Sequence, residues 1–300
     1  MEIVPLVSII TLNYNQAEVT CQFLESCRSL TYDNYAIHVC DMDSKQDLRV
    51  YVGRKSFDHT EFHYSDRNLG FAGGNNWGMQ FAKGDYILML NNDTEVEPDL
   101  IQKLLIPFEQ DSRTGIVCPV INYYDNKSVI QYAGFAPMNF YTGRTRTIGN
   151  KEIDHRQFDG IHETFGAHGA AMMVSRAVID ETGKFPEKFF LYYEEWDWST
   201  RILNAGYKIY LQGNARVYHK ESMSVGKSNP LKEYYLTRNR ILYMRRNSER
   251  MKLVIFYLFY SCFTIPKTAI KYAYKRNGAF LKAFFLGVSD SIRLSKNSQV

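Results

Sequence analysis

The residues best suited to chemistry stand at the end of a short apolar run. Residues 86–90 are apolar or aromatic, and the amides of Asn91 and Asn92 and the carboxylate of Asp93 follow directly. So short an apolar run predicts a strand buried on both faces. Asp93 would then lie at the carboxyl end of the strand, the edge where open α/β sheets bind ligands. Together with the glycine- and amide-rich residues 67–76, which read as a flexible polar loop, it could hold a metal-bound phosphate.

Similar polar residues follow two strand-like runs nearer the N-terminus. A β-branched run is broken by Asn13, Tyr14 and Asn15, and a second run ends at Asp41. Parallel strands would bring Asp41 to the same sheet edge as Asp93. The alternative for each aspartate is a structural one, because aspartates often form turns after strands.

An acidic cluster lies near the predicted start of a later helix. Glu194, Glu195 and Asp197 stand close together, and Arg201 follows Asp197 at the spacing of a structural ion pair. Acidic residues also favour helix N-termini through the helix dipole. A carboxylate in such a place could instead take a proton from an attacking hydroxyl. The residues alone leave these interpretations open.

The elements that must position these groups alternate between strands and helices. Strands are expected at residues 7–12, 35–40, 61–64, 86–90, 115–121 and 166–175, with a strand pair at residues 207–218. Helices are expected at residues 17–30, 99–110 and 189–205, and residues 122–161 read as an irregular insertion. This alternation predicts an α/β fold with a mostly parallel sheet flanked by helices.

Composition is typical of a globular protein in a reducing compartment. Hydrophobic residues make up 45% of the 300, enough for a core. The five cysteines form no Cys-x-x-Cys pair, and we expect them to be small buried apolar residues. The first residues lack the basic region and apolar stretch of a signal peptide, so export is not expected.

The last quarter of the chain differs in charge. Residues 227–300 hold 15 lysines and arginines against 3 acidic residues, whereas residues 1–226 hold 21 and 29. We therefore expect a catalytic domain over residues 1–226 and a basic, aromatic helical extension over residues 227–300. Leu253 to Ile265 is nearly all apolar before Pro266 interrupts it, which is short for a membrane span of about 20 residues. The extension suits an anionic membrane surface; packing on the main domain is the alternative.

Several familiar motifs are missing from the sequence. No Gly-x-Gly-x-x-Gly opens a helix, and neither Gly-x-Ser-x-Gly nor His-Glu-x-x-His occurs. Dinucleotide-binding enzymes and several classes of hydrolase are therefore disfavoured.

The motifs that remain form an ordered set, which runs through Val7–Asn15, Asp41–Ser44, Arg67–Asn76, Leu90–Asp93, Phe190–Asp197 and Val217–His219. This set resembles glycosyltransferase family 2, the inverting nucleotide-sugar transferases of GT-A fold, and within it the bacterial rhamnosyltransferase-like polysaccharide enzymes. The resemblance covers essentially the whole chain and rests on the order and spacing of the motifs. It implies a GT-A fold with a C-terminal helical extension.

The resemblance also implies a donor site with a divalent cation, Mn²⁺ or Mg²⁺. Asp41 would contact the nucleobase, and Asp93 matches the last position of the family's metal-binding Asp-x-Asp, here Asn91-Asn92-Asp93. His219 matches a histidine that completes the metal site. The other residues implied on the donor side are Asn13, Tyr14, Asn15, Arg67, Asn68, Gly73, Asn75 and Asn92.

The same resemblance implies a catalytic role for the acidic cluster. Glu195 matches the base that deprotonates the acceptor, with Glu194 as its rival. Trp196 and Asp197 are expected on the acceptor side, although Trp196 also suits the core. The remaining acceptor residues are Gly169 and Ala170, whose small size would leave room for a sugar or allow tight strand packing.

The expected reaction moves a sugar from a nucleoside-diphospho-sugar to a hydroxyl of a glycan or lipid-linked glycan during cell-surface polysaccharide synthesis. Rhamnose is suggested by the resemblance alone. The expected location is the cytoplasmic face of the cell membrane, with no nucleic-acid partner. One alternative, a sugar-phosphate nucleotidyltransferase, would need a glycine-rich loop where Asn13 to Gln16 stand. The other is a non-catalytic nucleotide-sugar-binding subunit.

Overall fold

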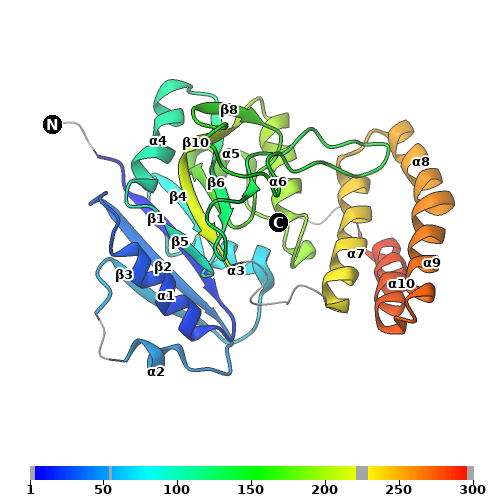
Figure 1. Ribbon diagram of the computed structural model, residues 1–300, viewed down its shortest axis with the longest axis horizontal. Helices are drawn as coiled ribbons and strands as arrows, with labels where there is room; N and C mark the ends of the chain where they lie inside the picture. Colours follow the sequence, from blue (N-terminus) through cyan, green and yellow to red (C-terminus); the bar gives the residue numbers. More distant parts are fainter. Residues whose placement is uncertain (1–3, 54–55, 221–228, 296–300) are drawn as a thin grey trace.

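A ten-stranded mixed sheet lies at the centre of the N-terminal part of the chain (Figure 1). The computed structural model describes residues 4–53, 56–220 and 229–295. The strand order along the sheet is β3-β2-β1-β4-β9-β6-β10-β5, with β7 beside β6 and β8 beside β10. The strands are β1 Val7–Asn13, β2 Tyr35–Met42, β3 Thr60–Ser65, β4 Tyr86–Leu90, β5 Thr94–Val96, β6 Thr114–Tyr123, β7 Ile130–Tyr132, β8 Ile161–Thr164, β9 Ala171–Ser175 and β10 Lys208–His219.

Only part of this sheet is parallel. Strands β3, β2, β1 and β4 pair in parallel, as the alternation of strands and helices predicted. Strand β9 then runs antiparallel to both β4 and β6. Residues 124–170, between β6 and β9, contain no helix, and an antiparallel return to the sheet needs no crossover helix.

Helices flank the sheet and form the C-terminal part. They are α1 Ala17–Cys27, α2 Leu48–Val52, α3 Gly70–Gly78, α4 Leu100–Gln110, α5 Arg176–Thr182, α6 Glu194–Asn204, α7 Pro230–Asn247, α8 Arg250–Phe259, α9 Ile265–Tyr274 and α10 Gly278–Arg293, with a 3₁₀ turn, η1, at Glu187–Phe189 and a π-turn, η2, at Tyr260–Thr264. The predicted helix at residues 189–205 is therefore shorter, because α6 begins only at Glu194.

Helix α3 corrects the expectation of a flexible glycine-rich loop. The helix begins at Gly70, inside that stretch, and its glycines allow close packing. A Cβ atom on Gly74 would lie 2.9 Å from Cδ1 of Leu12, and one on Gly78 would lie 2.7 Å from Cγ2 of Ile10. These glycines therefore serve the contact between α3 and β1.

The predicted strand pair at residues 207–218 is one continuous strand, β10. Its register with β6 shifts between Gln212 and Arg216, which marks a bulge. The bulge places the N–H of Gly213 2.7 Å from the carbonyl of Gly160. No Cβ fits there, because it would lie 1.5 Å from the carbonyl oxygen of Phe158. The turn-like residues therefore mark a bulge and a close backbone contact.

The C-terminal helices lie beside the sheet-centred part (Figure 1). Helix α8, η2 and α9 form one 25-residue helix from Arg250 to Tyr274, so Pro266 does not interrupt it. The π-turn ends at Thr264, two residues before Pro266. Its wider hydrogen-bonding pattern lets the helix continue although proline has no N–H group to donate. The expected domain boundary, between residues 226 and 227, lies outside the described residues.

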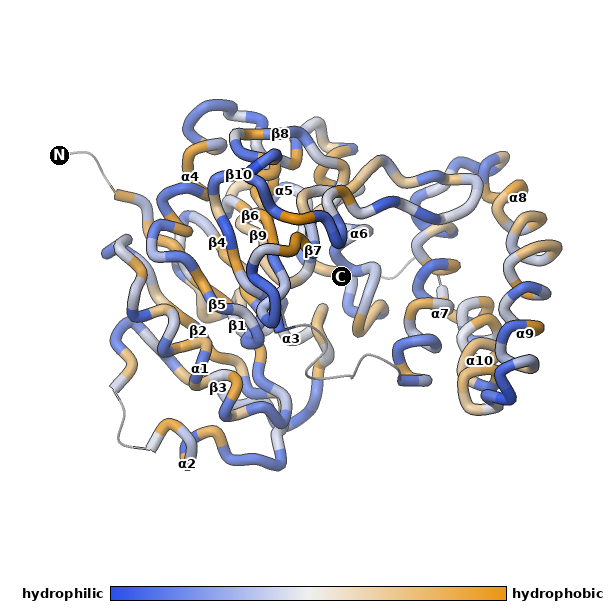
Figure 2. Tube along the Cα trace, in the orientation of Figure 1, coloured by the Kyte–Doolittle hydropathy of each residue, from blue (hydrophilic) through white to orange (hydrophobic). Residues whose placement is uncertain are grey.

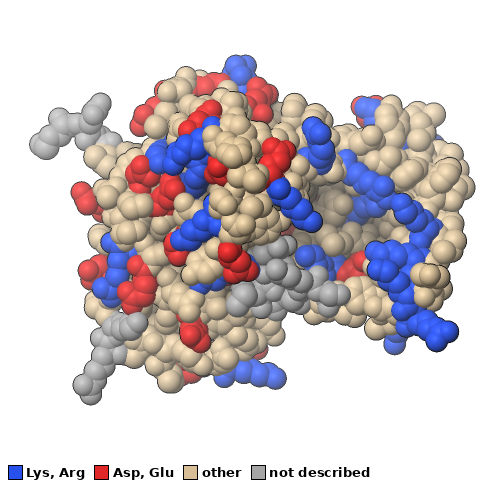
Figure 3. All heavy atoms as spheres, viewed as in Figure 1, with Lys and Arg blue, Asp and Glu red and all other residues tan. Residues whose placement is uncertain are grey.

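This long helix leaves much apolar surface exposed. It is long and apolar enough to cross a membrane by length and composition, and only 17% of its most apolar window is buried. Apolar residues recur along α8 and α9 (Figure 2), and Leu258, Phe263 and Ile270 are more than 60% exposed. Figure 3 shows lysines and arginines gathered over this part of the molecule. Only a small part of the surface of this helix is therefore buried by packing on the main domain.

All five cysteines are free. Burial was the expectation, and it is confirmed for Cys21, Cys27, Cys40 and Cys118. Cys262 differs because it lies on the exposed helix.

Candidate active site

A cavity of about 430 Å³ opens at the carboxyl ends of β1, β2 and β4. Its walls also include the loop before α3, the approach to β9, the start of α6 and the start of α7. The cavity brings together nine of the residues singled out in the sequence: Tyr14, Asn68, Asn92, Asp93, Gly169, Ala170, Glu194, Glu195 and His219. The other predicted residues do not line it: Asn13, Asn15, Asp41, Arg67, Gly73, Asn75, Trp196 and Asp197.

A buried chain of hydrogen bonds joins three predicted donor residues behind the cavity wall. The Asn13 amide donates to a carboxylate oxygen of Asp41, and its carbonyl accepts from the hydroxyl of Thr20 at 2.8 Å. The Asn92 amide donates to the same hydroxyl at 2.8 Å. The other oxygen of Asp41 accepts from the N–H of Ser44 at 3.0 Å. These bonds fix the ends of β1, β2 and β4 relative to one another.

Of the predicted donor-side residues between positions 67 and 75, the structure places only Asn68 on the cavity wall. Asn68 lines the cavity, and its side-chain oxygen accepts from the N–H of Gly70 at 2.8 Å. Gly73 and Asn75 are buried within α3, where the Asn75 amide donates to the carbonyl of Phe71 at 2.9 Å. The formation of α3 therefore removes both from the cavity wall. Arg67 is exposed on the loop before the helix.

Asp93 and His219 form a pair suited to a divalent cation. Asp93 Oδ1 is buried without a hydrogen-bond partner, and it lies 3.1 Å from His219 Nε2. His219 Nδ1 lies 2.8 Å from the side-chain oxygen of Gln131, and the ring must donate there because that oxygen only accepts. In neutral His219, Nε2 then presents a lone pair to the carboxylate of Asp93. Two facing acceptors require a proton or a metal ion between them, and an outer hydrogen bond such as that of Gln131 is typical of a metal-binding histidine.

The two glutamates share one wall of the cavity at the start of α6. Each has a carboxylate oxygen, Oε2, that is buried without a hydrogen-bond partner. Burial raises the pKa of Glu195 to about 7. Burial, followed by the charge of Glu195, raises the pKa of Glu194 further. Glu195 therefore ionises first, and Glu194 keeps its proton while Glu195 is charged.

The backbone before these glutamates is held in an unusual conformation. Phe190, Tyr192 and Tyr193 all have positive φ angles, between 62° and 75°. Such angles are costly for bulky residues and persist only when the surroundings enforce them. The strained segment ends directly at Glu194, so its shape determines where both carboxyl groups lie.

Helix α7 supplies the contacts that hold this segment. The Asn239 amide donates to the carbonyls of Phe189, Leu191 and Tyr192, each at 2.8 Å. Arg238 donates to the carbonyl of Phe189 at 2.7 Å and to that of Lys188 at 2.8 Å. On the other side, the carbonyl of Phe190 accepts from the first N–H groups of α3. The segment is thus fixed between α3 and α7.

The predicted acceptor residues fall into two groups. Gly169 and Ala170 line the cavity, and a Cβ atom on Gly169 would lie 3.3 Å from the ring of Phe71. Trp196 packs on Phe135, with ring centroids 4.8 Å apart, and lies outside the cavity. Small residues thus keep this part of the cavity open, and Trp196 belongs to the core.

Asp197 is fully buried away from the cavity. Its carboxylate accepts from Arg201 at 3.3 Å, from Arg246 at 2.7 Å and from Asn247 at 2.9 Å. These bonds join α6 to α7, so the structure favours the structural role that the spacing of Asp197 and Arg201 suggested.

Sequence reasoning missed four residues at or next to the cavity. His168 lines it, and burial lowers the pKa of this imidazole to about 3, so the ring is neutral. Its Nδ1 accepts from the N–H of Ala170 at 3.1 Å. Gln131 left no signal in the insertion between residues 122 and 161. The pair Arg238 and Asn239 stood in a recognisable run, Tyr-Tyr-Leu-Thr-Arg-Asn-Arg, but only the fold shows what the run contacts.

Comparisons with known proteins identify a family profile and several related glycosyltransferases. The profile described as Glycosyl transferase family 2 matches residues 8–183. The low-salt glycan biosynthesis hexosyltransferase Agl10 of Haloferax volcanii is 27% identical over 177 residues, 54% of this chain and 52% of that protein. The chain thus spans about half the length of that relative. The dTDP-rhamnosyl transferase RfbF of Shigella flexneri is 23% identical over 244 residues, 76% of each chain.

Solved structures share the fold at low sequence identity. A structure of GalNAc-T7 with UDP, GalNAc and Mn²⁺ has a TM-score of 0.61 at 16% identity, and the match covers 90% of this chain and 58% of that one. The mannosyltransferase PcManGT of Pyrobaculum calidifontis, in complex with GDP-Man and Mn²⁺, has a TM-score of 0.60 at 12% identity, over 98% of this chain and 77% of that one. The predicted GT-A fold is confirmed. Because the family profile covers more than half of the chain, the protein belongs to glycosyl transferase family 2.

Proposed function

We propose that the protein is an inverting glycosyltransferase that moves a sugar from a nucleoside-diphospho-sugar to a hydroxyl group of a glycan or lipid-linked glycan. The observation that carries this proposal is the composition of one cavity. It places a carboxyl group with a raised pKa, Glu195, in the same enclosure as the cation-suited pair Asp93 and His219. One end supplies a base and the other can hold a charged leaving group.

The acceptor hydroxyl is deprotonated by Glu195 in this reaction. The carboxylate takes the hydroxyl proton while the acceptor oxygen bonds to the anomeric carbon of the donor. The bond from that carbon to the diphosphate oxygen breaks on the opposite face, and the electron pair leaves with the nucleoside diphosphate. Glu194, which keeps its proton, adds no second negative charge beside the base.

The donor end of the cavity is assigned to the ends of β1, β2 and β4. Asp41 and Asn13 would meet the nucleobase side, and Asn68 and Asn92 the diphosphate side. Asp93 and His219 would hold a divalent cation, which offsets the charge that develops on the leaving diphosphate. Mn²⁺ fits better than Mg²⁺, because imidazole is a poor ligand for Mg²⁺.

The acceptor proposal rests on the C-terminal helices. Asn229, Leu231 and Lys232 at the start of α7 line the same cavity as the glutamates, so the α7–α10 part borders the acceptor end. Its exposed apolar residues and basic surface suit an anionic membrane, where a lipid-linked acceptor would lie (Figure 3). We assign the protein to the cytoplasmic face of that membrane. Rhamnose is the first donor sugar to test, because RfbF is named for it.

The direct test is a panel of nucleoside-diphospho-sugars, including dTDP-rhamnose, with Mn²⁺ and a candidate acceptor. Release of nucleoside diphosphate reports turnover. We expect Glu195→Gln to lower the rate by at least about 100-fold, the usual contribution of a general base. Asp93→Asn should lower it as well and raise the concentration of Mn²⁺ needed for half of the activity.

Two exposed acidic residues provide matched controls. Glu152→Gln and Asp180→Asn remove the same charges from exposed side chains that do not line the cavity, and they should leave turnover unchanged. Unchanged turnover in both Glu195→Gln and Asp93→Asn would overturn the mechanism. Donor binding without release of nucleotide under any condition would favour the non-catalytic alternative.

A further inference from the structure

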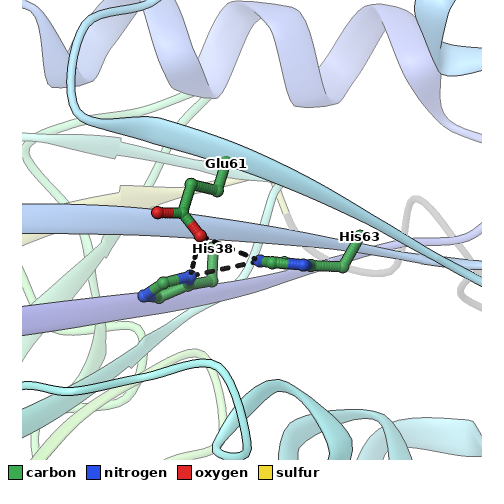
Figure 4. A group of neighbouring side chains, drawn as sticks. All are labelled: His38, Glu61 and His63. Carbon is green, nitrogen blue, oxygen red and sulfur yellow. Dashed lines mark hydrogen bonds and ion pairs between the residues drawn. The ribbon is translucent and has the colours of Figure 1, made fainter.

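Three side chains that suit a metal ion converge on strands β2 and β3, outside the cavity. His38 lies on β2, and Glu61 and His63 lie two residues apart on β3, so all three point to one face of the sheet (Figure 4). His38 Nδ1 lies 3.2 Å from His63 Nε2. The Glu61 carboxylate lies 3.6 Å from the first nitrogen and 3.7 Å from the second. None of the three lines the donor–acceptor cavity.

The two imidazole nitrogens are within hydrogen-bond distance of each other, and the three separations together fit a small cation between the groups. Zn²⁺ bound tetrahedrally at about 2.0–2.1 Å from each ligand would space the ligand atoms about 3.3–3.4 Å apart. The three separations in the structure lie close to that value. Both contacts to Glu61 exceed the length of a hydrogen bond, so the carboxylate faces the two imidazoles without bonding to either.

The surroundings favour neutral, oriented imidazole ligands. Burial lowers the pKa of both His38 and His63, and neutral imidazole is the form that binds metals. The ring of His63 stacks on Phe81, with centroids 3.8 Å apart, which fixes its orientation. The ammonium group of Lys83 is close enough to lower the pKa of His38, and the carboxylate of Glu61 opposes that positive charge.

Access to the group is open on one side. His38 is buried and Glu61 is exposed, so an ion could enter from solvent past the carboxylate. The exposed side also leaves a fourth position for water. Two histidines and one glutamate with an open position are a known ligand set for Zn²⁺.

We infer that His38, Glu61 and His63 bind a Zn²⁺-class transition-metal ion, with water as the fourth ligand, at a site separate from that of Asp93 and His219. The ion ties the edge strand β3 to β2. Because Asp41 follows His38 by three residues on β2, the ion also stabilises the strand that carries the predicted nucleobase contact. The inference does not depend on the proposed transferase activity.

The test is a cobalt and zinc titration of the chelator-treated full-length protein. An Asp93→Asn/His219→Gln background removes the other candidate metal site. In this background we expect one equivalent of Co²⁺ to give the intense visible absorption of four-coordinate cobalt, and Zn²⁺ to displace it. Zn²⁺ should also raise the melting temperature, because it binds only the folded form.

Substitution of the ligands then decides the assignment. In the same background, His63→Gln and Glu61→Gln should each abolish the cobalt absorption and weaken Zn²⁺ binding by at least about tenfold, the smallest effect seen even for outer-shell partners. Glu61 is exposed, so its variant should keep the parent's melting temperature without metal. His155→Gln removes an exposed histidine and should change neither readout. Equal Zn²⁺ affinity in the parent and both ligand variants would overturn the inference.

Discussion

At the scale of single residues, burial sets the protonation of the carboxyl pair. Glu194 and Glu195 stand together at the start of α6, where isolated glutamates would both be charged at neutral pH. Withdrawal from water raises both pKa values, and the charge of Glu195 raises that of Glu194 again. Two identical side chains therefore differ in charge, with Glu195 ionised and Glu194 neutral. A reaction that uses one base requires this difference.

Turnover should follow the ionisation of Glu195. Because the base must be deprotonated, kcat/KM should level off above pH 7 or so and fall about tenfold per pH unit below it. A profile from about pH 5 to 9 would check this. A rate that is flat down to pH 5 would exclude a base with a raised pKa.

The raised pKa of Glu195 makes the folded protein less stable as the pH rises, whereas turnover increases over the same range. Between the ordinary glutamate pKa of 4.5 and about 7, folded Glu195 binds more protons than unfolded Glu195, so the folded state loses stability as the pH rises through that window. Glu195→Gln should therefore melt at a higher temperature than the parent above pH 7, while the two should differ little below pH 4.5. An equal or lower melting temperature at high pH would contradict the assignment.

At the scale of elements, the segment before α6 depends on a helix from the other part of the molecule. Its residues have positive φ angles that are unfavourable for bulky side chains. Helix α7 offsets that cost through Arg238 and Asn239, and α3 holds the other side through the carbonyl of Phe190. The C-terminal helices are therefore part of the catalytic arrangement as well as a separate surface.

Loss of the Asn239 amide should impair catalysis more than it impairs folding. Asn239→Ala removes the side-chain donor to the carbonyls of Leu191 and Tyr192, at about 1–3 kcal/mol each unless the segment relaxes towards water, while the carbonyl of Phe189 keeps its bond from Arg238. Relaxation would move Glu195, so we expect kcat to fall about 100-fold with little change in the KM for donor.

Asn247→Ala is the matched control for this prediction. Asn247 lies on the same helix and donates to Asp197 and to the carbonyl of Tyr243. Its loss should lower the melting temperature of the protein while kcat stays near that of the parent. If both variants lose kcat in proportion to their loss of stability, the specific role of Asn239 is refuted.

At the scale of the whole molecule, charge and apolar surface are both unevenly distributed. Residues 227–300 hold 15 basic and 3 acidic residues, whereas acidic residues outnumber basic ones in the rest of the chain, and the 25-residue helix carries exposed apolar side chains (Figures 2 and 3). A basic surface draws a protein to anionic lipid, and apolar side chains then insert at the interface. This combination favours membrane contact over a free helix in water.

Membrane binding should depend on the exposed apolar side chains. Leu258→Gln/Phe263→Gln removes two of them without changing charge, so sedimentation with vesicles that contain anionic lipid should fall. Val50→Gln, which removes an exposed apolar residue on α2, should bind as the parent does. Equal sedimentation of all three proteins would rule out insertion of this helix. Binding that high salt abolishes in all of them would indicate a purely electrostatic contact.

The parallel half of the sheet and the polar residues at its edge could be predicted from the sequence. Continuous apolar runs at β1, β2 and β4 can be buried on both faces only within a sheet, and the polar residues that follow, Asp41 and Asp93, must then lie at its edge. The identity of the family followed from the order of these short motifs. Each strand and each motif consists of residues that are close together in the chain.

The other placements depend on contacts between segments that are distant in the chain. The glycines of α3 suggested a loop, and only their packing against β1 shows why they lie in a helix. Asp197 was expected on the acceptor side, and only its ion pair with Arg246 of α7 shows a structural role. The contact of His219 with Asp93 and the convergence of His38 with His63 join separate strands. Strand pairing and helix packing bring together residues that are distant in sequence. Such contacts produce no local sequence pattern from which they could be predicted.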